Sequence, residues 1–192
     1  LHGLGVKGQN HLFEAVISHR KHGPLSITII LMMGLTGVLL CMALSKTEGI
    51  LVFPLDDPYI HWSIGRSIFE NGNWGPSPFQ YQLSSSSPFY SLLSGIGTQL
   101  FHNPWFFTLI INLLAGLSWL ILMSRTKLIR KQSPFTQVLL LSGTASLLPW
   151  HLLVLLGMEH MCHILFICLF LHAATGSTSK NGMPALISGV LM

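Results

Sequence analysis

Long apolar runs alternate with polar segments along this chain. Two runs of about 20 residues contain no Asp, Glu, Lys or Arg, and that length suits a helix that crosses a lipid bilayer. A third apolar region, 134–174, is too long for one helix and is interrupted at Pro149 and again around Gly157. It therefore predicts two helices joined by a tight turn near Gly157. The predicted spans are 24–45, 104–123, 134–156 and 159–174, followed by a truncated run at 183–192.

Two shorter helices are predicted in the polar loop 46–103. The first, 58–71, shows isoleucine at every fourth position, an Asp-Pro pair at its start and an Asn-Gly pair at its end. We expect Asp57 to be its N-cap. The second covers 88–101 and begins with a Ser-Pro pair. At about 14 residues each helix is too short to span, so both are expected to lie at the membrane surface. The predicted fold is an all-α polytopic transmembrane helix bundle.

Composition and charge agree with a lipid environment. Hydrophobic residues make up 50% of the chain and charged residues only 8%, with a mean hydropathy of +0.59. Soluble domains have about 25% charged residues. Most of the ten basic residues fall on one side of the predicted topology, which should be cytoplasmic and places loop 46–103 outside. They are not interleaved with aromatic residues, so the pI near 9.2 does not indicate nucleic-acid binding. These basic residues are Lys7, Arg20, Lys21, Arg125, Lys127, Arg130, Lys131 and Lys180.

The ends of the sequence indicate a piece of a longer protein. It begins at Leu1 rather than Met, and it ends at Met192 about ten residues into a new apolar run. Such a run covers only about half a bilayer. We therefore expect a cytoplasmic segment, 1–23, followed by the N-terminal part of a transmembrane domain, 24–192.

Two adjacent carboxylates, Asp56 and Asp57, stand out in a chain with so few charges. Adjacent carboxylates repel each other unless a cation or a hydrogen-bond donor compensates. One interpretation is a helix-capping Asp57 beside a spare acid. The other is a general base, alone or with a divalent-metal ligand, that faces a substrate held in the membrane. Because Asp57 precedes a proline, we expect it to cap the helix and leave Asp56 free.

A second candidate group lies where the chain turns back near Gly157. Glu159 either caps the next helix or faces Asp56 as a second site carboxylate. His160 and His163 are spaced to share one helix face and could ligate a metal, although no other clear ligand accompanies them. His61 follows the two aspartates, and a surface role is favoured for it over a catalytic one.

Three stretches together resemble a known family. They are "LDDPYIHWSIGRSIFENGNWG", "SSSSPFYSLL" and "LLPWHLLVLLGMEHMCHILF", and they resemble the first outer loop, the Ser-Ser-Pro segment and the Gly-Met-Glu helical pair of GT-C membrane glycosyltransferases. The likeness is closest to the bacterial and archaeal branch and covers the chain from about Pro24 onward. Gly65 stands where that branch has alanine. The matching positions of the first stretch are Asp56, Asp57, Tyr59, Ile60, Arg66, Ile68, Gly72, Trp74 and Gly75.

The resemblance implies an enzyme that transfers a sugar from a polyprenyl-phosphate carrier to a glycan, lipid or protein acceptor at the extracytoplasmic face. It implies that Asp56 is the general base and that Asp57 lies beside it. If the two aspartates bind a metal, the resemblance implies a divalent cation, Mg²⁺ or Mn²⁺. The family's later helices and soluble C-terminal domain are missing, so this piece alone is expected to be inactive. The substrate-binding candidates are Tyr59, His61, Arg66, Glu159 and His160.

The alternative is a non-catalytic polytopic membrane protein, either a degenerate GT-C subunit or a transporter fragment. Transporter sites lie near the bilayer midplane and use buried ionisable residues. The middle of each predicted span lacks Asp, Glu, Lys and Arg, which disfavours a transporter.

Overall fold

A computed structural model describes residues 4–176, except 78, 80, 83–84 and 102–103. Within that part the chain forms eight helices and no strand, so the all-α prediction is confirmed. The apolar run 183–192 lies outside the described residues.

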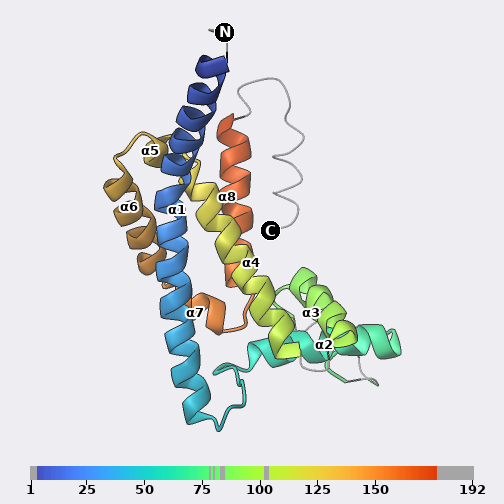
Figure 1. The fold of residues 1–192 in the computed structure, drawn as a ribbon. Coiled ribbons are helices and arrows are strands. Elements are labelled where there is room, and N and C mark those ends of the chain that lie inside the picture. Colours follow the sequence, from blue (N-terminus) through green and yellow to red (C-terminus); the bar gives the residue numbers. More distant parts are fainter. Residues whose placement is uncertain (1–3, 78, 80, 83–84, 102–103, 177–192) are drawn as a thin grey trace.

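Two helices are long and apolar enough to cross a membrane. Helix α1 covers Leu4–Lys46 and contains the first predicted span, and α4 covers Pro104–Ser124 and coincides with the second. Both lie lengthwise along the molecule (Figure 1). Apolar side chains along α1 face outward; Ile30, for example, is 69% exposed and Val38 is 56% exposed. An apolar surface of this extent is rare on a soluble monomer.

The third predicted span is not one continuous helix. The structure has α6 at Pro134–Leu147 and α7 at Trp150–Leu155, so the prediction of a helix over 134–156 is wrong. Pro149 lies at the break, where it has no N–H to donate and its ring clashes with the preceding turn. The 14 residues of α6 reach only about 21 Å, less than the hydrocarbon core.

The turn predicted near Gly157 is confirmed. Gly157 has a φ of +75°, which favours glycine, and a Cβ there would come within 2.5 Å of the Phe53 ring. Helix α8 follows at His160–Gly176 and is shorter than the two long apolar helices.

Both loop helices are present within one residue of the predicted bounds. Helix α2 covers Asp57–Asn71 and ends at Gly72, which has a left-handed φ of 66°; α3 covers Pro88–Leu100. The predicted cap is wrong by one residue, because Asp56 is the N-cap and Asp57 already belongs to α2. The carbonyl of Asp56 accepts hydrogen bonds from two backbone N–H groups in the first turn, and its side chain makes no cap bond.

Glycine allows α2 and α3 to pack very closely. A Cβ added at Gly65 would lie 2.5 Å from the backbone nitrogen of Gly95 and closer still to the carbonyl oxygen of Ser91. These two helices pack against each other more extensively than any other helix pair in the described structure. Small residues permit such close backbone approach, so glycine at position 65 fixes the spacing of the loop helices.

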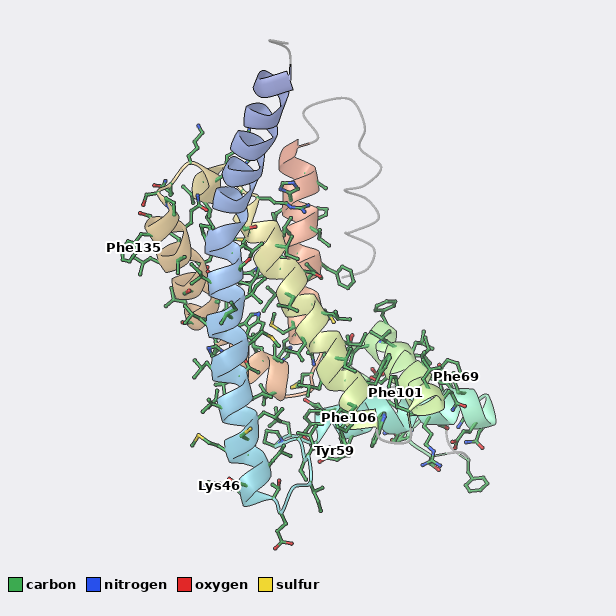
Figure 2. All side chains as sticks on the ribbon, viewed as in Figure 1. Lys46, Tyr59, Phe69, Phe101, Phe106 and Phe135 are labelled. Carbon is green, nitrogen blue, oxygen red and sulfur yellow. The ribbon has the colours of Figure 1, made fainter. Side chains whose placement is uncertain are left out.

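The loop helices and the basic residues of 125–131 lie at opposite ends of the bundle. Figure 1 shows α2 and α3 beside the start of α4, and α5, Lys127–Arg130, beyond its other end. In Figure 2, Tyr59 lies toward the Lys46 end of α1, whereas Phe135 points outward in the other half. The buried core between α4, α7 and α8 includes Trp119, Leu120, Trp150, Val154 and Met161.

Candidate functional site: a buried histidine–carboxylate cluster

The centre of the site is a contact between α2 and the turn before α8. His61 Nε2 lies 3.2 Å from Oε2 of Glu159, and the two residues are 1% and 4% exposed. On its other side, His61 Nδ1 is 2.9 Å from the hydroxyl of Ser91 on α3. Three elements that are distant in sequence therefore hold one imidazole ring between them.

The serine-rich segment before α3 completes the cluster. The hydroxyl of Ser85 is 3.2 Å from His61 Nδ1 and 2.8 Å from the hydroxyl of Ser91. The hydroxyl of Ser86 donates to Oε1 of Glu159 at 3.3 Å. Ser85 thus contacts the histidine, and Ser86 contacts the carboxylate.

Glu159 is negatively charged in this setting. Burial disfavours the charge, but the contact with His61, its own backbone N–H and the nearby imidazole of His160 outweigh burial and lower the pKa of Glu159 to about 2. Its Oε2 atom is buried and lies outside hydrogen-bond geometry with every described partner, including His61. The site therefore contains a charged carboxylate with one oxygen incompletely satisfied.

Tyr90 holds the turn that carries Glu159. Its hydroxyl donates to the carbonyl of Gly157 at 2.9 Å and accepts from the amide of Asn112 on α4 at 3.4 Å. The ring also packs edge-on against His61, with centroids 5.4 Å apart. Burial raises the pKa of Tyr90, so the hydroxyl keeps its proton and acts as a donor.

A cavity of about 410 Å³ opens beside the cluster, between α3 and α8. Its polar wall includes Ser86 and Glu159 together with His163. Its apolar wall includes Phe89 and Phe166, whose ring centroids are 6.4 Å apart. The cavity can therefore contact a molecule that has both polar and hydrocarbon parts.

The two aspartates lie at the start of α2, one turn before His61. Asp56 is exposed and Asp57 is half-buried. Neither carboxylate makes a hydrogen bond or ion pair within the described part of the chain, so the expectation that Asp57 caps the helix is wrong. The α2 side chain that contacts Glu159 is that of His61.

The other predicted site residues separate into two groups. His160 is half-buried beside Glu159. Tyr59 packs its ring against Trp105, with centroids 4.6 Å apart, and lies in an aromatic group at the start of α2. Arg66 pairs with Glu70 through contacts of 2.9 Å and lines a different cavity, of about 550 Å³. The structure thus brings His61, Glu159 and His160 together and leaves Arg66 apart.

Sequence reasoning misjudged His61 and missed several neighbours. The sequence favours a surface role for His61, but the residue is buried because the Gly65–Gly95 contact brings α3 over it. In the sequence, the serines of "SSSSPFYSLL" indicate a helix start and contribute to the family resemblance, but they are not predicted site residues. Asn112 is a buried amide within an apolar helix, and that placement is itself a signal. The missed residues are Ser85, Ser86, Tyr90, Ser91 and Asn112.

The chain is thus a helical protein in which two helices are long and apolar enough to cross a membrane. A buried histidine–carboxylate cluster lies near one end of these two helices. No protein-family model, no curated protein and no solved structure matches the chain.

Proposed function

We propose that this chain belongs to an integral membrane glycosyltransferase of the GT-C type. It transfers a sugar from a polyprenyl-phosphate carrier to an acceptor at the extracytoplasmic face. One observation carries the proposal: the three stretches that resemble the family in sequence also meet in space. His61 comes from the first, Ser86 and Ser91 from the second and Glu159 from the third.

The distribution of charge supports the proposed orientation. The basic residues of 125–131 lie at the end of the bundle opposite to α2 and α3 (Figure 1). Basic loops favour the cytoplasmic side of a membrane. In this orientation Asp56, Asp57 and the cavity face the outside, and α1 and α4 cross the bilayer.

In the proposed mechanism Asp56 accepts the proton of an acceptor hydroxyl. The hydroxyl oxygen forms a bond to the anomeric carbon while the bond from that carbon to the phosphate oxygen breaks. The polyprenyl phosphate leaves with the electron pair. Ser86 and Glu159 bind sugar hydroxyls, and the phenylalanine wall of the cavity contacts the hydrocarbon chain.

The exposure of the two aspartates supports different roles for them in this proposal. Asp56 is exposed and has no described partner, so it is free to reach an acceptor. Asp57 is half-buried and lies on the same helix face as His61, one turn earlier. If a divalent cation such as Mg²⁺ or Mn²⁺ takes part, carboxylates of this kind are suitable oxygen ligands for it.

The test uses the full-length protein in liposomes with a polyprenyl-phosphate sugar. Asp56→Asn should lower transfer by about 10²–10⁴-fold, the usual contribution of a general base. Asp57→Asn should cost less. Glu48→Gln, which removes an exposed acid from the same loop, is the control and should keep full transfer.

Two results would change the proposal. Full transfer by Asp56→Asn would remove the base assignment. Equal losses from Asp56→Asn, Asp57→Asn and addition of a chelator would identify the pair as metal ligands instead.

A further inference from the structure

We infer that Glu159, His160 and His163 form a binding site for a divalent transition-metal ion of the Zn²⁺ type. One ligand atom from each residue lies within 4.8 Å of the other two. Tetrahedral ligands at about 2.0–2.1 Å from zinc lie roughly 3.3 Å apart. Small side-chain rotations are therefore enough to close the three ligands around an ion.

The types of ligand atom in this site favour zinc over Mg²⁺ and Ca²⁺. Two imidazoles and one carboxylate are a common ligand set for zinc, whereas Mg²⁺ and Ca²⁺ prefer oxygen ligands. The inferred site is thus distinct in place and in chemistry from any Mg²⁺ or Mn²⁺ site at Asp56 and Asp57.

An independent observation in the buried carboxylate points to a cation. Oε2 of Glu159 is buried, since the residue is only 4% exposed, and its 3.2 Å contact with His61 Nε2 lies outside hydrogen-bond geometry. A buried, charged oxygen whose neighbouring donor is misaligned is incompletely satisfied, which is costly. A bound cation would satisfy it directly.

The surroundings of Glu159 suit a metal ligand. Ser86 donates to its other oxygen, and His61 lies against it. Hydrogen-bonded neighbours of this kind orient metal-binding carboxylates. Tyr90 fixes the preceding turn through the carbonyl of Gly157. The carboxylate is therefore held in place before any ion arrives.

The cavity supplies access and a free coordination position. Both histidines are half-buried, and His163 and Glu159 line the cavity of about 410 Å³. Three protein ligands leave one position of a tetrahedral ion for water or for a molecule in the cavity. An ion there would face the same space in which the proposed function places the sugar.

The test measures metal binding and needs no transfer activity, so its outcome is separate from that of the proposed function. The purified full-length protein, equilibrated with Zn²⁺ in detergent, should hold one ion per chain. His160→Ala and His163→Ala should each weaken binding by more than the roughly 10–100-fold that loss of an outer hydrogen-bond partner costs. Ser86→Ala should fall within that range.

Matched controls separate this site from others. His172→Ala changes a histidine on the same helix and should leave binding unchanged, as should Asp56→Asn. In the unsubstituted protein, Zn²⁺ should protect His160 and His163, but not His172, from modification by diethyl pyrocarbonate. This second measurement does not depend on the folding of any variant.

The inference is overturned if the unsubstituted protein binds no Zn²⁺, if Zn²⁺ leaves His160 and His163 as reactive as before, or if Asp56→Asn abolishes binding.

Discussion

The substitution Gly65→Ala tests whether close packing of α2 and α3 builds the polar cluster. The added Cβ would lie 2.5 Å from the nitrogen and 2.7 Å from the Cα of Gly95, so α3 has to move away by about 1 Å to reach ordinary contact. His61 and Ser91 each lie one helical turn from this crossing, and their bond is 2.9 Å long. A shift of that size would take it beyond hydrogen-bond distance.

The expected change in the free energy of unfolding is the sum of three contributions. Overpacking costs about 1–3 kcal/mol, and loss of the hydrogen bond about 1 kcal/mol. Alanine regains about 1 kcal/mol through its higher helix propensity. The net loss should be about 1–3 kcal/mol, measured as the free energy of unfolding in mixed micelles by tryptophan fluorescence.

Two further variants separate the effect of overpacking at Gly65 from other effects on stability. Gly143→Ala is the matched control, because no atom lies within 4 Å of its added Cβ, and it should be neutral or stabilised by up to about 1 kcal/mol. Ser91→Ala removes the hydrogen bonds of this hydroxyl to His61 and Ser85 without overpacking and should cost about 1–3 kcal/mol. If Gly65→Ala is as stable as Gly143→Ala, the crossing does not set the helix spacing.

Further predictions concern topology and the turn before α8. In the intact full-length protein, a membrane-impermeant thiol reagent should label a cysteine at Asn73→Cys but not at Leu128→Cys, and the reverse pattern would contradict the proposed orientation. Tyr90→Phe leaves the buried carbonyl of Gly157 without its donor, so it should lower the free energy of unfolding by about 1–3 kcal/mol in the same micelle assay; an unchanged value would mean that the carbonyl finds another donor.

Local signals in the sequence were sufficient for most helix boundaries. The start of α3 at a proline and the end of α2 before a left-handed glycine both follow from restrictions on single residues. The N-cap of α2 was predicted one residue too late because Asp56 already has helical backbone angles. Such errors of one residue are inherent to helix ends, where backbone and side chain compete for the same N–H groups.

The candidate site was only partly predictable. The aspartates and Glu159 were found because charged residues are rare in this chain. The partnership of Glu159 with His61, 98 positions apart, could not be derived, since no local pattern states which helix faces meet. The serines are not predicted site residues because a helix start already explains the Ser-Pro pair, and only the fold shows that Ser85 and Ser86 contact His61.

The sequence alone determined that this protein has long apolar helices. Runs of about 20 apolar residues specify helices able to cross a membrane, because each backbone group in lipid must be satisfied within its own segment. The tertiary structure decided which polar side chains meet. The Gly65–Gly95 crossing and the Tyr90–Gly157 bond set the spacing between α2, α3 and the turn before α8. That spacing buries His61 against Glu159, because close contact between side chains depends on how helices pack and not on their order along the chain.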